Sequence, residues 1–134
     1  MADLETSNVT PTGIWNFTGA AAGSVFNTAA TTITANASHL QADATALTAG
    51  INNVTVVATD LDAVKLPTAV AGLVVVIVNS DATQTIGVWP NTGDDVGAGA
   101  NTVSAVALAA GKARVCYAVD ATNWKCFTDV TILA

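Results

Sequence analysis

Apolar and polar residues alternate along most of the chain after residue 52, with the period of two that is typical of β-strands. In the segment 53–59, "NVTVVAT", this alternation places Val54 and Val56 on one face. The most apolar run is Ala69–Val78, "AVAGLVVVIV". A helix needs about 20 apolar residues to span a bilayer, so this shorter run of Val and Ile predicts a buried strand instead.

Turn-forming residues separate these segments and predict two hairpins. The turn "SDAT" joins residues 73–79 to residues 85–89, and residues 112–130, "KARVCYAVDATNWKCFTDV", form the second hairpin. Strands that recur every 8 to 12 residues or so, with turn signals between them, are typical of an all-β sandwich or barrel. We therefore predict a mainly β fold, a single antiparallel β-sandwich or jelly-roll-like domain, with one short helix and an extended N-terminal arm.

The helix is predicted over residues 39–49. Ser38 followed by Gln41 matches a capping box, and Gly50 suits the C-terminal cap. Apolar residues recur between these signals at helical spacing, namely Leu40, Ala44, Leu47 and Ile51. His39, the single histidine, falls in the first turn, where a solvent-facing or capping role is the expected one.

The first 35 residues show no helical or strand periodicity over most of their length, and we predict an extended arm over residues 1–35 and a β-sandwich domain over residues 36–134. A short strand is expected at 14–18, where Trp15 and Phe17 share one face. The large apolar residues of the arm have two possible roles, since they either dock on a partner or complete the core of the domain. The candidate contacts are Ile14, Trp15, Phe17 and Phe26.

Charge is scarce for a globular protein. Charged residues make up 10% of the chain, against roughly a quarter in an average domain, and the net charge is −6. Four basic residues cannot neutralise many phosphates, so we expect neither nucleic-acid binding nor a basic membrane-surface helix. The N-terminus, "MADLETSNVT", has no basic region of a secretory signal. So few charges favour a subunit covered by its neighbours over a free domain with a Thr, Ser and Asn surface.

The register of the last hairpin decides whether the two cysteines can form a disulfide. A turn centred on residues 121–122 places Tyr117 opposite Cys126 and Arg114 opposite Asp129, an ion pair that favours this register. Cys116 and Cys126 then point to opposite faces, and we predict free thiols. A three-residue loop over 120–122 is the alternative; it would pair the cysteines but is expected to lose the ion pair.

Catalytic and metal motifs are absent from the sequence, and we predict no enzyme activity, no cofactor and no metal. Almost all carboxylates fall in predicted turns, where aspartate is favoured for backbone reasons. Asn91, Asp94 and Asp95 form an oxygen-rich loop of the kind that calcium binds. The alternating acidic pattern of a calcium loop with its distal glutamate is missing, however.

Residues 63–127, about half the chain, resemble small β-rich virion proteins of tailed bacteriophages. The resemblance begins with the "LP..VAG" lead-in at 66–72 and a Val-rich strand that ends in Asn79. An "ALAAGK" turn at 107–112 follows, and then a strand whose hairpin partner carries Trp124. Between them lies the pattern "V.P..GD.V" at Val88, Pro90, Gly93, Asp94 and Val96.

The resemblance implies a head decoration, or cement, protein that acts by binding alone. Such a protein is expected on the outer surface of the head after synthesis in the host cytoplasm. It would bind the major capsid protein as a homotrimer, with multivalency raising the total affinity. The alternative is a tail or fibre component that contacts glycans, for which Trp89 with Asn91, Asp94 and Asp95 forms the only suitable cluster. Trp89, Asp94 and Asp95 are candidate partner contacts in either case.

Overall fold

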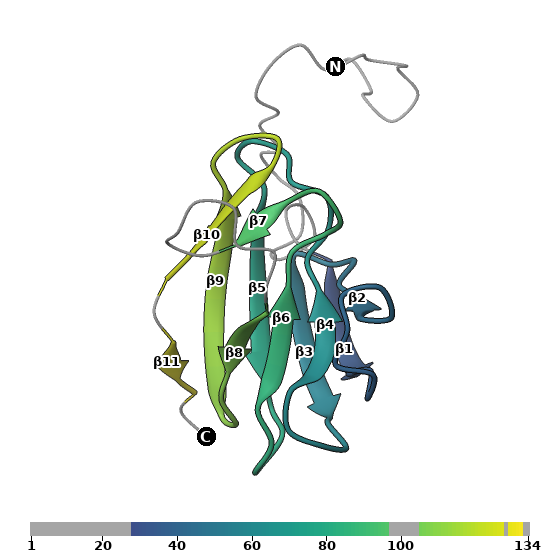
Figure 1. Ribbon diagram of the computed structural model, residues 1–134. Coiled ribbons are helices and arrows are strands. Elements are labelled where there is room, and N and C mark those ends of the chain that lie inside the picture. The colour runs from purple at the N-terminus through teal and green to yellow at the C-terminus, as the bar shows by residue number, and fades with distance from the viewer. Residues whose placement is uncertain (1–27, 97–104, 128, 133–134) are drawn as a thin grey trace, which may run out of the picture.

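The computed structural model describes residues 28–96, 105–127 and 129–132, and these residues form strands and turns without a helix (Figure 1). The strands are β1 (Ala29–Thr34), β2 (Thr45–Ala46), β3 (Ile51–Val56), β4 (Asp62–Lys65), β5 (Val74–Asn79), β6 (Ile86–Trp89), β7 (Asp95–Val96), β8 (Val106–Leu108), β9 (Lys112–Ala118), β10 (Asn123–Cys126) and β11 (Val130–Thr131).

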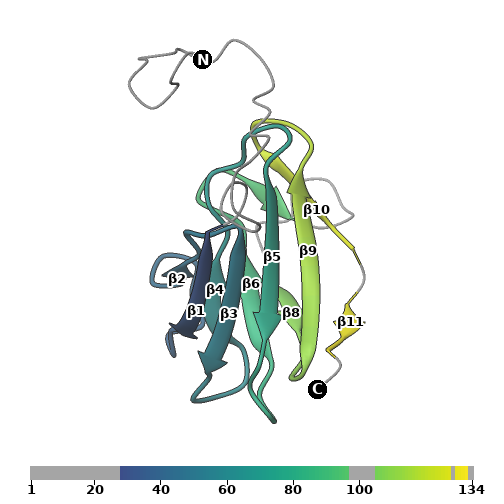
Figure 2. The ribbon, with the colours of Figure 1, turned by 180° about the vertical axis from the view of Figure 1, so that it is seen from behind.

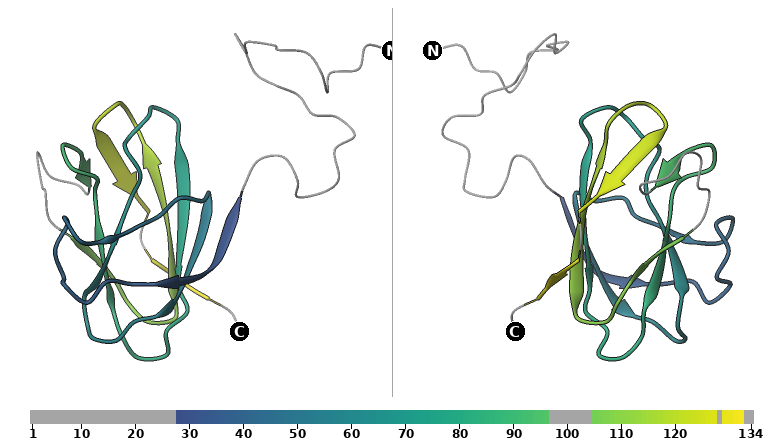
Figure 3. Two further views of the ribbon diagram at one scale, coloured as in Figure 1. Left: turned by 90° about the vertical axis from the view of Figure 1, so that its right-hand side faces the viewer. Right: turned by 60° about the vertical axis from the view of Figure 1, so that its left-hand side comes forward.

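The chain winds through two sheets as a β-solenoid of about four turns. Sheet A has the order β1-β3-β5-β9-β10-β7, with β11 also on β9, and sheet B has the order β2-β4-β6-β8. From β1 to β6 the strands fall alternately in A and B, and the neighbours within each sheet are parallel. Figure 3 shows the two layers edge-on. The prediction of an antiparallel β-sandwich or jelly roll was therefore wrong.

The first predicted hairpin is wrong for the same reason. β5 lies in sheet A and β6 in sheet B, so the turn between them is a corner of the solenoid. Asn79, buried at the end of β5, donates from its side chain to the carbonyl oxygens of Gln84 and Leu108 at 2.9 and 3.0 Å. These bonds, with the Asp81 side chain that accepts the Thr83 and Gln84 N–H groups, turn the chain toward the second sheet.

The predicted helix over 39–49 is absent, and β2 with several turns takes its place. His39 has a φ of 59°, in the left-handed region, which interrupts a helix at its first turn. Gln41 does not cap, since its side-chain amide donates to the Pro90 carbonyl oxygen at 2.9 Å. The apolar residues at helical spacing do not share a face, because Leu47 is buried whereas Leu40 is 58% exposed.

The hydrophobic core lies between the two sheets. In β5 alternate residues point inward, so that Val75 and Ile77 are buried while Val74 and Val76 face out. Each fully buried Val, Ile or Leu contributes about 1.5–3 kcal/mol. The largest buried side chains from both sheets are Trp124, Leu47, Leu66, Ile77, Ile86 and Leu108.

The C-terminal strands close sheet A in antiparallel fashion, so the second predicted hairpin, β9 with β10, is confirmed. Its predicted register is wrong. Val119 N–H donates to the Asn123 carbonyl oxygen, which leaves a three-residue loop over 120–122 and sets Cys126 opposite Cys116. The two cysteines form a disulfide, so the prediction of free thiols was wrong as well.

The ion pair expected between Arg114 and Asp129 is present all the same. The register of β9 shifts by one residue between its two partners, because β11 pairs Val130 with Ala113 whereas β10 pairs Cys126 with Cys116. This shift lets Cys116 and Arg114, both on β9, reach Cys126 and Asp129 at the same time. The disulfide and the ion pair, predicted to exclude one another, therefore occur together.

The arm predicted over 1–35 is described only from residue 28. β1 lies in this range and pairs in parallel with β3 at the edge of sheet A. The candidate contacts Ile14, Trp15, Phe17 and Phe26 lie outside the described residues.

Candidate functional site

A corner of the solenoid between β3 and β4, residues 57–61, contains one of the two non-glycine residues with a positive φ in the described chain, and His39 is the other. Leu61 has a φ of 68°, in the left-handed region, which is costly for a residue with a bulky side chain. Its N–H donates to the Thr85 carbonyl oxygen at 2.7 Å, and the Asp60 carboxylate accepts the Thr85 N–H at 2.9 Å. These bonds to the next turn of the solenoid hold Leu61 in place.

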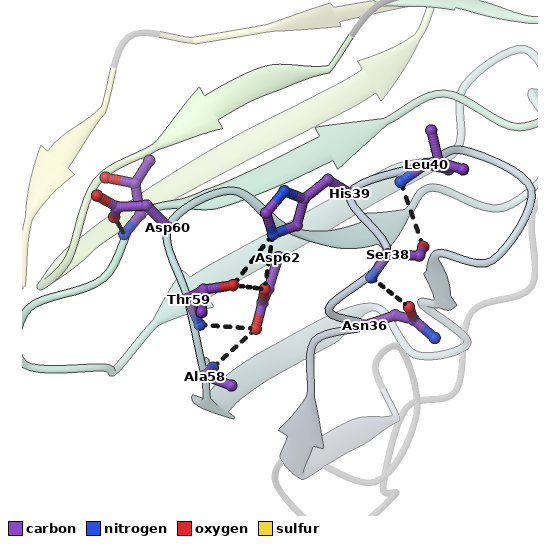
Figure 4. A network of polar contacts seen from close by, with 9 residues as sticks. Asn36, Ser38, His39, Leu40, Ala58, Thr59, Asp60 and Asp62 are labelled. Atoms are coloured by element: carbon purple, nitrogen blue, oxygen red, sulfur yellow. Dashed lines mark hydrogen bonds and ion pairs between the residues drawn. The ribbon is translucent and has the colours of Figure 1, made fainter.

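Asp62 organises this corner from within. Its side chain is fully buried and accepts hydrogen bonds from the Ala58 N–H at 2.7 Å, the Thr59 N–H at 3.1 Å and the Thr59 hydroxyl at 2.7 Å. His39, from the preceding turn of the solenoid, places Nε2 3.1 Å from an Asp62 oxygen (Figure 4). A backbone bridge between Asn36 and Ala63 joins the same two turns. We call residues His39, Thr59 and Asp62 the corner network.

The electrostatics of the corner network favour an ionised Asp62. Burial alone would raise the pKa of Asp62, but the hydrogen bonds from the Thr59 hydroxyl, from the backbone of Thr59 and Ala58 and from His39 together hold that pKa below its ordinary value of 3.8. An ionised carboxylate only accepts hydrogen bonds, so the contact with Asp62 is a hydrogen bond in the form of His39 that carries a proton on Nε2. That same N–H also faces the Thr59 hydroxyl oxygen at 3.1 Å.

The corner network contains a hydroxyl, an imidazole and a carboxylate, but its geometry is not that of an activated nucleophile. Activation requires one imidazole nitrogen to accept the hydroxyl proton while the other nitrogen faces the carboxylate. Here His39 Nε2 faces both partners, and the Thr59 hydroxyl donates directly to Asp62. The arrangement is suited to fixing the shape of the corner.

The corner exposes polar side chains, Thr59 and Asp60, beside apolar ones. Leu61 is 47% exposed, and Leu40, directly after His39 in the sequence, is 58% exposed. Backbone strain of this kind persists where the surroundings enforce it, and it is concentrated at functional sites. The corner therefore holds the exposed Leu61 on a backbone fixed by hydrogen bonds, and Leu40 is exposed beside His39 on the preceding turn. This geometry is suited to binding another macromolecule.

The candidate contacts from the sequence lie elsewhere, around the end of β6. Trp89 is half-buried, with its indole Nε1 buried, and Asp94 is only 3% exposed, with its carboxylate accepting the Ala69 N–H at 2.7 Å. Asp95 begins β7 and donates its N–H to the Thr122 carbonyl oxygen at 2.7 Å. The two aspartates thus form hydrogen bonds that join neighbouring segments of the chain. They and Trp89 do not form the exposed surface of aromatic ring and amides that suits glycan binding.

Metal-binding clusters of three or more His, Cys, Asp or Glu side chains do not occur among the described residues. In the same ranges, no helix is long and apolar enough to cross a membrane.

Sequence reasoning missed the corner network because its members are far apart in the chain. His39 and Asp62 are separated by 23 residues, which is about one turn of the solenoid. The local signal is the pattern Thr59–Asp62, a turn in which an aspartate accepts nearby N–H and hydroxyl groups. Nothing in the sequence connects that turn to His39.

Comparison of the chain with protein-family models, with curated proteins and with solved structures finds no match in any of the three.

Proposed function

We propose that the chain is a structural protein of a tailed-bacteriophage virion, a head decoration protein that binds the major capsid protein as an oligomer, commonly a trimer, and stabilises the lattice without enzymatic action. The resemblance of residues 63–127 to small phage virion proteins supports this class, as does the scarcity of charge.

The observation that carries the proposal is the exposure of apolar side chains on a rigid scaffold. Ten large apolar residues are exposed on the described surface, and they include Leu40 and Leu61 at the corner. Exposed apolar side chains mark interaction sites where they gather into a contiguous patch, which is what the proposal requires of Leu40 and Leu61. Of the four basic residues of the chain, Arg114 is buried and paired with Asp129, so few basic side chains would have to lose water in an apolar contact.

The Cys116–Cys126 disulfide also fits a protein that acts outside the cytoplasm. Disulfides persist in oxidising surroundings, and a virion meets such surroundings after release from its host. A repeating lattice adds to the effect of weak individual contacts, because an oligomer that binds several lattice positions gains affinity without new contacts.

The proposal is tested by cosedimentation of the full chain with undecorated phage heads. We expect saturable binding at hundreds of copies per head, which a tail or fibre component would not show. The corner is tested by Leu40→Asn and Leu61→Asn. Each change removes apolar surface, and asparagine tolerates the left-handed backbone at position 61. Each should weaken binding about tenfold or more.

Val130→Asn is the matched control, because Val130 is 58% exposed on β11, at the other end of the chain's course. Equal loss of binding in all three variants would show that the corner has no special role. Absence of binding by the unmodified chain would contradict the head decoration proposal itself.

A further inference from the structure

An apolar groove crosses the outer face of sheet A, away from the corner. It has a volume of about 310 Å³ and is lined by Gly72, Val74, Val115, Tyr117, Ala118 and Phe127. Phe127 is 61% exposed and Val74 is 49% exposed. The rings of Tyr117 and Phe127 lie with their centroids 5.5 Å apart, so one wall of the groove is aromatic.

A straight row of paired residues leads from the start of β1 to this groove. Ala29 pairs with Ile51, Ile51 with Val76, and Val76 with Val115. The Val115 carbonyl oxygen then accepts the Phe127 N–H at 2.9 Å. The strands concerned lie side by side in Figure 2, and with a spacing of about 4.8 Å between strands the row is about 19 Å long. Its side chains on the outer face are apolar throughout.

The described chain begins with Thr28, at the far end of this row, and the N-terminal segment, residues 1–27, precedes it in the sequence. The Thr28 carbonyl oxygen accepts the Ile51 N–H at 3.1 Å, which fixes the point of entry. Phe17 precedes Thr28 by 11 residues, and such a stretch spans up to about 36 Å when extended. The segment is therefore long enough to bring Trp15 and Phe17 to the groove.

The composition of the segment also suits an apolar face. Residues 6–28 contain no charged side chain, so laying them across the row would not remove any charge from water. The sequence "GAAAG" at 19–23 has no bulky side chain to obstruct the crossing. Trp15 and Phe17 then supply large rings, which gain more from burial than any other side chains.

We infer that the groove receives residues 14–17 of the same chain, with the rings of Trp15 and Phe17 against Tyr117 and Phe127. The segment crosses the outer face of sheet A along the row from Ala29 to Val115. This contact belongs to the isolated protein, so it does not depend on the proposed function, and it leaves Leu40 and Leu61 exposed.

The test uses the full chain labelled with fluorotryptophan, whose three ¹⁹F resonances are assigned by Trp15→Phe and by comparison with Trp89→Phe. We expect the Trp15 resonance to be shielded from solvent, with a small shift between H₂O and D₂O. The double variant Val74→Ala with Phe127→Ala should move it to the solvent-exposed position. Leu40→Ala, an exposed apolar residue off the groove, should leave it unchanged. Unchanged Trp89 and Trp124 resonances show that each variant is folded.

The inference would be overturned if Trp15 were exposed to solvent in the unmodified chain. It would also be overturned if the Trp15 resonance did not move in the Val74→Ala, Phe127→Ala variant. A neighbouring copy is distinguished by refolding two chains together. One is labelled and carries Phe127→Ala and Val74→Ala, and the other is unlabelled and carries Trp15→Ala and Phe17→Ala. Shielding of Trp15 that returns only in the mixture would show that the segment crosses between copies, which contradicts docking within one chain.

Discussion

Cys116 and Cys126 lie directly opposite one another on β9 and β10 and are joined by a disulfide, while Asp129, three residues beyond Cys126, pairs with Arg114 on the same strand. The one-residue shift of register between β10 and β11 permits both contacts. The C-terminal side of the solenoid is thereby fixed at two neighbouring points of β9.

Removal of the disulfide should destabilise the protein. In the double variant Cys116→Ala with Cys126→Ala, we expect the free energy of unfolding in urea to fall by about 2–3 kcal/mol, because the crosslink closes a loop of about ten residues in the unfolded chain. A reducing agent should lower the stability of the unmodified protein by a similar amount and leave the double variant unaffected. A thiol titration of the unmodified protein in denaturant should find no free thiol; two free thiols would contradict the disulfide.

Truncation of Asp129 should cost more than its partly exposed position suggests. Arg114 is almost fully buried and also donates to the Ala107 carbonyl oxygen at 2.6 Å, so Asp129→Ala leaves a buried cation without its carboxylate. We expect a loss of about 1–3 kcal/mol by chemical denaturation, and a smaller loss when Arg114→Leu and Asp129→Leu are combined. Lys112→Ala, which removes an exposed bond to Thr131, serves as the control and should cost less than about 0.5 kcal/mol. Additive losses in the Arg114 and Asp129 variants would exclude coupling between them.

Acid should unfold the protein partly through the corner network. The pKa of Asp62 is lowered in the folded state, so its contribution to stability is present above the ordinary value of 3.8 and is lost as the pH falls through the lower, folded value. The pKa values of Asp81 and Asp120 are lowered in the same direction, chiefly by hydrogen bonds from the backbone N–H groups of Thr83 and Thr122. The melting temperature should therefore fall steeply below about pH 4.

Asp62→Asn separates the corner from the other carboxylates. The variant should melt at a lower temperature at pH 7 than the unmodified protein. Its melting temperature should also fall less steeply with decreasing pH, since the carboxylate that takes up the proton is gone. Asp43→Asn removes the same charge from an exposed turn and should keep the slope of the unmodified protein. Parallel curves for Asp62→Asn and the unmodified protein would show that Asp62 does not contribute to the acid response.

Gly87 should be intolerant of even one added carbon. A Cβ at this position would lie 3.1 Å from the Leu61 carbonyl oxygen, so Gly87→Ala pushes against the corner that Leu61 occupies. We expect a loss of about 1–3 kcal/mol in urea unfolding. Gly111 provides the contrast, because a Cβ there meets nothing within 4 Å but the φ is 66°.

The two glycines should respond differently to asparagine. Gly111→Asn should be milder than Gly111→Ala, since asparagine tolerates the left-handed region. Gly87→Asn should be worse than Gly87→Ala, because its obstacle is space. If Gly87→Asn were more stable than Gly87→Ala, the close approach of the Leu61 carbonyl oxygen would not be the reason for a glycine at position 87.

Sequence periodicity was sufficient to predict strands but not their partners. The alternation in β5 predicted a strand, and the same alternation fits a hairpin or a solenoid equally well, because a period of two gives the face of a residue and says nothing of the neighbouring strand. The decisive residue, Asn79, lies at a corner and forms its bonds to Gln84 and Leu108, the latter 29 residues away. The helical spacing at 40–51 was a coincidence, since Leu40 and Leu47 face different surroundings.

The site was less predictable than the fold for a related reason. Contacts that build the corner join residues one solenoid turn apart, as with His39 and Asp62 or Asp60 and Thr85. Their separations of 23 and 25 residues acquire meaning only once the length of a turn is known. The charged pair Arg114 and Asp129 was predictable because both residues belong to one local arrangement of antiparallel strands.

The position of β1 at the edge of sheet A gives the molecule a mechanical polarity. In a stack of parallel turns, each turn is supported mainly by the next one, so stability is distributed along the axis. The last strands are crosslinked, whereas β1 pairs with β3 alone within the described chain. Amide exchange should therefore be fastest in β1 and slowest in β9, and a pulling force should peel the solenoid turn by turn from its N-terminal side. If the chain binds a phage head as proposed, it would best bear load through its crosslinked end.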